Sequence, residues 1–311
     1  MMFEQLGLIG CGLIGGSFAL ALKRAGLVKR VVGYSKSPST TERARQMGVI
    51  DVEAPSALLA VSGADIVLLA VPVSATEATF KAIRHLVTSQ ALIMDVGSTK
   101  RDVVDAARRV LGPHVGSFVP AHPIAGKEVS GVEHADADLF VGKQVVITPI
   151  ERTLTAKLKQ ATDIWTAMGS KVLQMSPESH DAAFAAVSHL PHLIAFALMN
   201  AITGQPHGKD YLSLAGPGFR DFTRIAASDP KIWRDILVLV GIDAAAVGNV
   251  RDFAHDDFPP ARVAEHAVIA GRALARVGIG AIRQEIPGLD HRGLRFLCGR
   301  RGPKPRALSP R

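Results

Sequence analysis

The hydrophobic positions of this chain fall into short continuous runs that alternate with segments of helical spacing through its first half. Runs such as 64–73 and 91–96 are apolar apart from one aspartate in each, Asp65 and Asp95, which is typical of strands buried on both faces. The expected strands are 6–9, 30–34, 64–73, 91–96, 118–120, 144–148 and 171–175, and the expected helices are 17–22, 40–47, 76–86, 100–111 and 153–168. This alternation predicts an α/β fold built on a doubly wound parallel (Rossmann) sheet.

The pattern changes near Ser176 and Pro177. From Glu178 to Leu239 the spacing is helical and strand signals are absent. The segment 182–202 predicts a long apolar helix interrupted at Pro191, too hydrophobic to lie exposed, so it belongs in a core or a dimer interface. We therefore expect three parts: a nucleotide-binding Rossmann domain at 1–174, an all-helical domain at 175–286, and an irregular, basic, disordered tail at 287–311.

A glycine-rich segment follows the expected first strand. Gly10, Gly12 and Gly15 have the G-x-G-x-x-G spacing of a dinucleotide-binding loop, placed after a strand and before a helix. The helix N-terminus would present free N–H groups to phosphates. The other interpretation is a tight strand-to-helix turn without a ligand. The remaining residues expected at the cofactor are Leu13 and Ile14 in this loop, Val71 and Pro72 at the end of the 64–73 run, and Ser98.

The end of the second expected strand bears on the choice between NAD and NADP. In NAD-binding folds an acidic residue about 20 positions beyond the glycines accepts a hydrogen bond from the ribose. Here Ser35, Lys36 and Ser37 follow the strand, and no acid occurs before Glu42. These side chains would bind a 2′-phosphate, so we expect NADP as the preferred cofactor, with NAD as the alternative.

Charge and composition narrow the function classes. The net charge is +8, but the segment 287–311 holds seven Lys and Arg residues and one acid, so most of the excess lies in the tail. This distribution argues against nucleic-acid binding. Cys11 and Cys298 match no metal-binding spacing, and Cys11 fits as a small packing residue. The N-terminus has no basic segment typical of a signal peptide, and no apolar stretch reaches the ~20 residues of a membrane span. We expect a cytoplasmic protein without a metal.

Polar residues follow several expected strands, where ligands bind in doubly wound sheets. His122, held between a strand end and a proline, suits acid–base chemistry, although a structural histidine is the alternative. Ser98 is either functional or a helix cap. In the helical half, Arg220 and Arg224 are four residues apart and would clamp carboxylates or form a surface ion-pair patch. His189 and His192 would share a helix face if Pro191 did not intervene.

Five segments in order resemble the prephenate/arogenate (cyclohexadienyl) dehydrogenases of tyrosine biosynthesis. They are GCGLIGGS, DVGSTK, HPIAGKEVSG, SHLPH and GFRDFTRIAASDPKIWRD, and the resemblance covers residues 3–236. It implies an oxidative decarboxylation: hydride leaves the carbon that bears the 4-hydroxyl for the nicotinamide, the ring carboxylate departs as CO₂, and the ring becomes aromatic. It also implies a homodimer formed through the helical domain.

The resemblance assigns roles to individual residues. His122 matches the catalytic histidine that binds the 4-hydroxyl and assists its deprotonation, and Ser98 matches the serine that helps orient it. Arg224 matches the arginine that binds a substrate carboxylate. The other matches at or near the substrate site are His192, His180, Glu128 and Trp233. Glu128 is also a candidate for favouring the ammonium group of arogenate, but we expect dual specificity.

The chain departs from the family after Ile236. Glycines and prolines punctuate the remaining segment, although Val263–Val277 retains a helical pattern. An altered reading frame and a divergent C-terminus are both explanations. Two other functions remain open. A β-hydroxyacid dehydrogenase would need a lysine on the first long helix, and none occurs between Glu178 and Ile202. The second is a dinucleotide-binding regulator that has lost turnover.

Overall fold

The computed structural model describes residues 2–127 and 129–239. Its N-terminal half contains an eight-stranded sheet in the order β3-β2-β1-β4-β5-β6-β7-β8. The strands are β1 Phe3–Ile9, β2 Val28–Tyr34, β3 Val52–Glu53, β4 Ile66–Leu69, β5 Leu92–Asp95, β6 Phe118–Pro123, β7 Gln144–Ile147 and β8 Lys171–Gln174. The expected α/β fold with a Rossmann sheet is confirmed.

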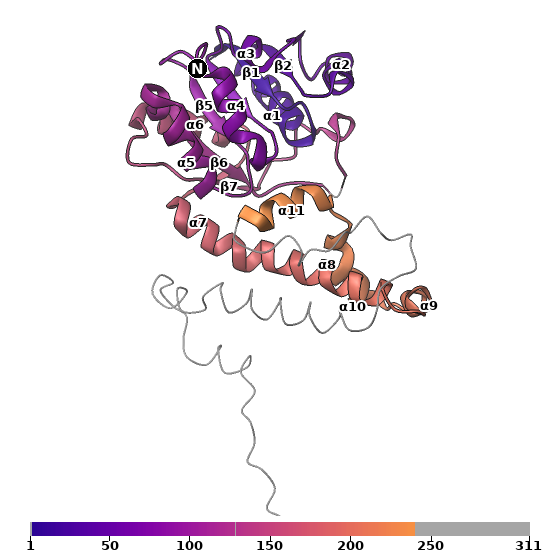
Figure 1. The fold of residues 1–311 in the computed structure, drawn as a ribbon. Coiled ribbons are helices and arrows are strands. Elements are labelled where there is room, and N and C mark those ends of the chain that lie inside the picture. Colours follow the sequence, from indigo (N-terminus) through magenta and orange to yellow (C-terminus); the bar gives the residue numbers. More distant parts are fainter. Residues whose placement is uncertain (1, 128, 240–311) are drawn as a thin grey trace, which may run out of the picture.

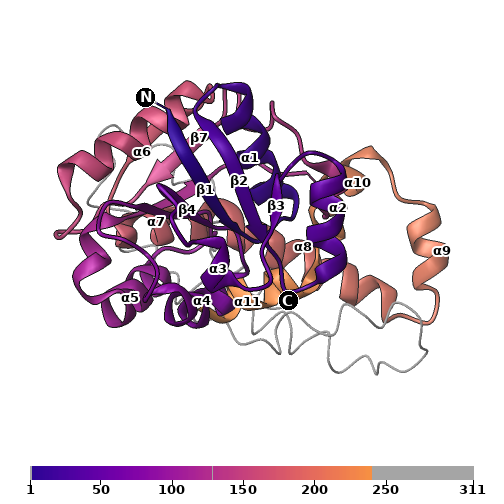
Figure 2. The ribbon, with the colours of Figure 1, turned by 90° about the horizontal axis from the view of Figure 1, so that it is seen from above.

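Helices cover the sheet and then continue as a separate layer (Figures 1 and 2). In the sheet lobe they are α1 Leu13–Arg24, α2 Pro38–Gln46, α3 Ala57–Ala60, α4 Thr76–Ile83, α5 Arg101–Val110 and α6 Thr155–Ala167. In the helical lobe they are α7 Pro177–Phe184, α8 Leu190–Thr203, α9 Gly208–Ser213, α10 Pro217–Thr223 and α11 Pro230–Leu239. The described part of the helical lobe, 176–239, contains no strand, as the sequence predicted.

Alternating strand residues build a core on each face of the sheet. Leu68 of β4 belongs to the cluster under α1 and α6, whereas its neighbour Leu69 belongs to the cluster under α4 and α5. This alternation is the period of two that a strand imposes. Phe18 of α1 packs edge-on against Trp165 of α6, with ring centroids 5.1 Å apart. The two filled faces fix the strands in one register and so fix the loops at their ends.

The sheet's carboxyl edge gathers the predicted site segments. Strands β2, β1, β4, β5 and β6 run parallel. The glycine loop after β1, the segment after β4 and the segment after β5 therefore emerge at one edge. β6 carries His122 beyond the last residue that pairs with β5, because Pro120 is already opposite Asp95. Doubly wound folds bind ligands at this edge, at the point where the strand order reverses, which here lies between β1 and β4.

The sheet contains one antiparallel pair, between β6 and β7, which the parallel pattern expected from the sequence did not include. β7 pairs antiparallel with β6, and β8 then runs parallel to β7. A parallel connection normally needs a crossover helix. The connection 124–143 holds only the short 3-10 turn η3, Val132–His134, which packs against α1 and α2. The chain therefore returns beside β6 in the opposite direction. The sequence also missed two short elements, β3 and α3.

Pro191 does not break the long apolar helix. Residues Ala185–His189 form a π-helical turn, η4, between α7 and α8, and the helix runs continuously from Pro177 to Thr203. Pro191 lies in the first turn of α8, where its missing N–H costs little, and the wider turn before it adjusts the hydrogen-bond register. His189 and His192 therefore share a helix face after all.

This continuity also corrects the expectation that no segment is long enough to span a membrane. The helix Pro177–Thr203 has 27 residues and contains an 18-residue window with a mean hydropathy of 1.6, so it qualifies by length and composition. The sequence pattern missed this because Pro191 divided the helix into two shorter pieces. Length and composition alone are weak evidence, since core helices of soluble proteins share them. The expected tail at 287–311 and the expected domain boundary at residue 286 both lie outside the described residues.

Candidate functional site

The glycine loop has the form that a dinucleotide requires. Gly10 adopts φ +95°, and a Cβ there would lie 2.1 Å from the Ala70 carbonyl oxygen. A Cβ on Gly15 would meet the Gly10 oxygen at 2.0 Å, so α1 could not approach the loop. At Gly12, by contrast, a Cβ would meet nothing within 4 Å. The N-terminus of α1 has no capping side chain and no acid in its first turn. Its N–H groups and the open space at Gly12 fit a pyrophosphate.

Ser35 supports this loop from the end of β2. Its Oγ accepts a hydrogen bond of 2.8 Å from the backbone N–H of Cys11. Burial raises the pKa of the Cys11 thiol to about 11, so the thiol stays protonated at neutral pH, which agrees with a packing role. Lys36 and Ser37 are exposed, and the Ser37 hydroxyl lies 2.9 Å from that of Ser39. The structure thus gives Ser35 a loop-holding contact that the sequence did not predict.

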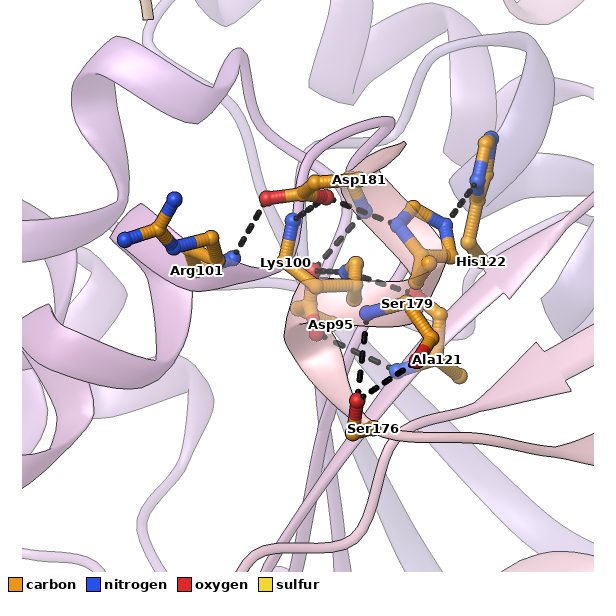
Figure 3. Close-up of polar contacts among 10 residues, drawn as sticks. Asp95, Lys100, Arg101, Ala121, His122, Ser176, Ser179 and Asp181 are labelled. Atoms are coloured by element: carbon orange, nitrogen blue, oxygen red, sulfur yellow. Dashed lines mark hydrogen bonds and ion pairs between the residues drawn. The ribbon is translucent and has the colours of Figure 1, made fainter. Parts of the chain in front are cut away.

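A chain of polar contacts runs from His122 into the helical lobe. His122 Nδ1 lies 2.8 Å from Nε2 of His180, and His180 Nδ1 lies 2.8 Å from Oδ1 of Asp181 (Figure 3). Asp181 also accepts the backbone N–H groups of Lys100 at 2.8 Å and Arg101 at 2.9 Å. The carboxylate therefore joins the first residues of α7 to the start of α5. We call His122, His180 and Asp181 the relay.

The relay fixes the tautomer of His122. An ionised carboxylate only accepts, so His180 Nδ1 donates to Asp181. In neutral His180, Nε2 is then an acceptor, and His122 Nδ1 must donate to it. This leaves Nε2 of His122 without a proton, as a hydrogen-bond acceptor at the sheet's carboxyl edge. A group that accepts a proton from a substrate hydroxyl needs this form.

Electrostatics keep both imidazoles neutral. Burial, with the nearby charge of Lys100, lowers the pKa of His122 well below its ordinary value. Burial also lowers the pKa of His180, although Asp181 opposes that effect. At Asp181, burial raises the pKa, but the hydrogen bonds from His180 and from two backbone N–H groups outweigh it and hold the carboxylate ionised.

A buried ion pair lies behind His122. Lys100 Nζ contacts the Asp95 carboxylate, and both side chains are almost fully buried. Lys100 also donates to the carbonyl of Ala121 at 2.8 Å, and Asp95 accepts the backbone N–H of Ala121 at 3.3 Å and of Gly97 at 2.9 Å. Both partners therefore hold the backbone of the residue before His122. The pair fixes the end of β6 relative to β5.

The helical lobe adds two further histidines and a tryptophan. His192 Nδ1 lies 2.9 Å from the carbonyl of Ser188, so Nδ1 donates and Nε2 is an acceptor. The indole ring of Trp233, on α11, stacks on His192 with centroids 3.6 Å apart and planes at 17°. His189 contacts the edge of the same indole, and burial lowers its pKa to about 4. These rings join α8 to α11.

The two candidate arginines lie on α10 and on the 3-10 turn that follows it. Arg224 is exposed at the start of η5, Arg224–Ala227, which packs against α8. Arg220 lies within α10, and its Nε donates to the Ala215 carbonyl at 3.1 Å, whereas Arg224 begins the 3-10 turn that follows α10. Their roles toward a substrate stay predictions.

Two more of the predicted residues have no established role. Ser98 is half-buried in the segment after β5, and among the described residues His122 pairs with His180, not with Ser98. Val71 and Pro72 follow β4 at the same edge of the sheet. Glu128 lies outside the described residues. Within the residues that the structure describes, no group of three or more His, Cys, Asp or Glu side chains is arranged to hold a metal.

Asp181, Lys100 and Asp95 were not assigned to the site from the sequence. Lys100 and Asp95 were visible as charges next to a buried apolar strand, which is a signal of a buried pair or of a site. Asp181 gave no such signal, because its contact with Lys100 spans 81 residues.

Comparison with known protein families settles the family. The model of the prephenate dehydrogenase nucleotide-binding domain matches residues 18–174, and that of the prephenate dehydrogenase dimerization domain matches residues 176–241. The chain belongs to the prephenate dehydrogenase family. This assignment removes the β-hydroxyacid dehydrogenase alternative and confirms the resemblance seen in the five motifs.

Individual members of the prephenate dehydrogenase family are similar over most of the described chain. A prephenate dehydrogenase of Bacillus subtilis is 39% identical over 76% of this chain and 64% of its own length. A cyclohexadienyl dehydrogenase of Zymomonas mobilis is 35% identical over 76% of this chain and 81% of its own. The crystal structure of an Aquifex aeolicus prephenate dehydrogenase with hydroxyphenyl propionate and NAD+ has a TM-score of 0.73 and 34% identity, covering 91% of this chain and 99% of that one. The chain thus spans just under two thirds of the Bacillus relative.

Proposed function

We propose that this member of the family oxidatively decarboxylates prephenate, arogenate or both, with a nicotinamide cofactor as the hydride acceptor. The observation that carries the proposal is the relay, which leaves an unprotonated nitrogen of a neutral imidazole at the same edge of the sheet as the glycine loop. The family assignment supplies the substrate class. Cyclohexadienyl and prephenate dehydrogenases among the relatives support both candidate substrates.

His122 performs the proton step in this proposal. Its Nε2 accepts a hydrogen bond from the substrate's 4-hydroxyl and takes the proton as the C–H bond is broken. When bound, the cofactor accepts the hydride from the carbon that carries this hydroxyl. The ring carboxylate leaves as CO₂, and its bonding electrons complete the aromatic ring. His180 and Asp181 hold the imidazole in the productive tautomer and stabilise the positive charge that develops on it.

The helical lobe binds the substrate's carboxylates and side chain in this proposal. Arg224 supplies a guanidinium on the segment that packs against α8. His192 presents an acceptor nitrogen and an aromatic surface that Trp233 holds in place. Ser98 and Glu128 keep the roles that the motifs assign to them. Because Arg224, His192 and Trp233 act mainly in binding, their loss is expected to raise KM more than it lowers kcat.

Replacing Asp181 with asparagine tests the relay. The amide has one acceptor oxygen, whereas the carboxylate now serves His180, the N–H of Lys100 and the N–H of Arg101. An amide oxygen in place of Oδ1 can still accept from His180 and Lys100, but the NH₂ group then faces the N–H of Arg101, and the negative charge that stabilises a positive charge on the two imidazoles is lost. We expect kcat to fall about 10–100-fold with little change in KM, measured by cofactor reduction at saturating substrate.

The pH profile separates this positioning role from a purely structural one. His122 must be neutral to accept the proton, and its pKa lies well below the ordinary 6.5 because burial disfavours the imidazolium. Activity of the unmodified protein is therefore complete above pH 6.5 and is lost only as the pH falls through the lowered pKa. Asp181→Asn should lower the plateau, while the exposed control Asp163→Asn on α6 should leave it unchanged. An unchanged plateau in Asp181→Asn would contradict the relay.

We propose that NADP is preferred over NAD. Lys36 is exposed immediately beyond β2, and no acidic side chain occurs between Ser35 and Thr41 to bind the ribose of NAD or to repel a phosphate. Ser35 still has its O–H to donate, because its contact with Cys11 uses only the oxygen as an acceptor. A positive charge and hydroxyl donors favour a 2′-phosphate.

Lys36→Asp is expected to reverse this preference. A carboxylate there repels a 2′-phosphate and accepts from a 2′-hydroxyl, so KM for NADP should rise about tenfold or more and KM for NAD should fall. The matched control is Lys29→Asp, at the opposite end of β2. Steady-state KM values for both cofactors give the result, and a protein that already prefers NAD, or a Lys36→Asp variant with an unchanged ratio, would refute the NADP proposal.

We propose a homodimer formed through the helical lobe and a soluble, cytoplasmic protein. Val187 and Leu214 are 72% and 83% exposed in the single chain, and only 22% of the most apolar window of the long helix is buried. The family model for this segment is a dimerization domain. His180 and His189 are buried and Asp181 is half-buried on the same helix, which favours a protein interface over a lipid environment.

A direct assay tests the proposed function. Purified protein is given prephenate and arogenate in parallel, each with NADP and with NAD, and cofactor reduction and CO₂ release are measured together. We expect equal molar amounts of both products with at least one substrate. Cofactor binding without any turnover would favour the catalytically impaired, regulatory alternative and would refute the proposal.

A further inference from the structure

A second contact between the lobes lies away from the relay. Ser74, in the short turn η1 (Val73–Ala75) that follows β4, donates its hydroxyl to Oδ2 of Asp235 on α11 at 2.7 Å. The two residues are 161 positions apart in the chain. The Asp235 side chain is 28% exposed and its other charged neighbour, Arg234, is 3.8 Å away and more exposed. The hydroxyl therefore has a partly sheltered carboxylate as its partner.

On the sheet side, this contact is attached to the proposed cofactor loops. Val73 packs closely on Gly97: a Cβ added to Gly97 would lie 3.1 Å from Cγ2 of Val73. η1 thus rests on the segment after β5, and it directly follows Val71 and Pro72. A ligand that orders the ends of β4 and β5 would also order Ser74.

On the helical side, the contact is attached to the proposed substrate-binding rings. Asp235 lies two residues after Trp233, which stacks on His192. Ile236 and Leu237 are buried, so this part of α11 is packed as one unit. A shift of Asp235 relative to the sheet would therefore move Trp233 and tilt its contact with His192.

We propose that Asp235 is a positioning residue that couples cofactor binding to substrate binding through Ser74. With the loops after β4 and β5 ordered by cofactor, Ser74 holds α11 in place, and Trp233 fixes His192 for the substrate. Without this hydrogen bond, ordering of the loops after β4 and β5 no longer affects the position of α11. The inference rests on the proposed function only for the identity of the substrate, since the coupling of the loops to α11 is a property of the fold. By linkage, each ligand then tightens the binding of the other by the same factor.

Hydrogen exchange tests the coupling without any turnover. Full-length protein is compared with and without saturating oxidised cofactor, as the unmodified chain and as Ser74→Ala, Asp235→Ala and Asp235→Asn. We expect cofactor to slow amide exchange in residues 230–237 of the unmodified protein, and to leave it unchanged in the two alanine variants. Asp235→Asn keeps an acceptor oxygen and should retain most of the effect. The exposed control Asp163→Ala should behave as the unmodified protein.

Binding of hydroxyphenyl propionate gives the second measurement. Its Kd is determined by calorimetry with and without cofactor. Cofactor should tighten it at least about fivefold in the unmodified protein, and Ser74→Ala, Asp235→Ala and their combination should all reduce that ratio toward one. In steady state, the alanine variants should raise substrate KM and leave kcat within about twofold.

The outcomes separate the two hypotheses. Equal weakening of the analogue with and without cofactor, or unchanged cofactor protection of 230–237 in Ser74→Ala, would overturn the coupling. If the unmodified protein turns over neither prephenate nor arogenate and does not bind the analogue, the proposed function fails, while the exchange experiment still decides whether Ser74 links the loops to α11.

Discussion

Replacing His122 with asparagine is expected to lower kcat about 10²–10⁴-fold, the usual contribution of a positioned proton acceptor. Asparagine keeps a hydrogen-bonding side chain but takes up no proton at neutral pH. KM for substrate and cofactor should change only a few-fold, because the hydroxyl is one of several groups that the site binds. Initial rates of cofactor reduction at saturating substrate measure the effect.

The control for this variant is His85→Asn, an exposed histidine at the end of α4. It should retain full activity. A far-ultraviolet spectrum and a melting curve show whether His122→Asn folds as the unmodified protein does. Near-normal kcat in a folded His122→Asn protein would mean that another group accepts the proton, and the mechanism proposed for the relay would be wrong.

Replacing Lys100 with methionine is expected to destabilise the protein by about 3–5 kcal/mol, the range for removing one partner of a buried ion pair. Methionine fills a similar volume but leaves the Asp95 charge buried with only backbone N–H groups as donors, and it leaves the Ala121 carbonyl without its amine partner. Urea unfolding followed by tryptophan fluorescence gives the difference in free energy.

The matched control is Lys81→Met, which removes the exposed pair between Lys81 and Glu77 on α4. Pairs of this kind contribute about 0–1 kcal/mol, so its effect should be within that range. Combining Lys100→Met with Asp95→Asn removes the unpaired charge and should recover part of the lost stability. A Lys100→Met protein as stable as the Lys81→Met control would contradict the role assigned to this pair.

The sequence predicted the strands well because burial on both faces leaves a direct mark. β4 is apolar at every position and β5 at every position but its last, Asp95, and a soluble chain has few other uses for such a run. The direction of β7 was not predictable in this way, because a buried strand has the same pattern whichever way it runs. The information lay in the connection 124–143, where the lack of a crossover helix was a signal of the turn back.

Pro191 illustrates the limit of local rules. A proline inside a helical pattern normally predicts a break. A π-helical turn, Ala185–His189, directly precedes Pro191 and lets one helix run on through the proline. That adjustment depends on packing between α7, α8 and the sheet lobe, none of which a window of sequence contains.

The sequence singled out His122 as a candidate proton acceptor, but it did not predict the contacts that hold this histidine. His122 stood out because a histidine at a strand end before a proline is held in place and exposed to a ligand. Its partner His180 was expected only to line the substrate site, and their contact spans 58 residues. Asp181 and Ser74 were not singled out, since contacts between lobes follow from the three-dimensional arrangement and leave no periodic signal in the chain.

The most direct test of the proton-accepting role of His122 is a crystal structure of this protein with oxidised cofactor and a 4-hydroxyphenyl product analogue. We expect Nε2 of His122 to lie about 2.6–3.2 Å from the analogue's hydroxyl, with Nδ1 still bonded to His180 and the nicotinamide ring on the other side of the same carbon. A complex in which Nε2 of His122 faces away from the hydroxyl, or in which His180 has left His122, would contradict it.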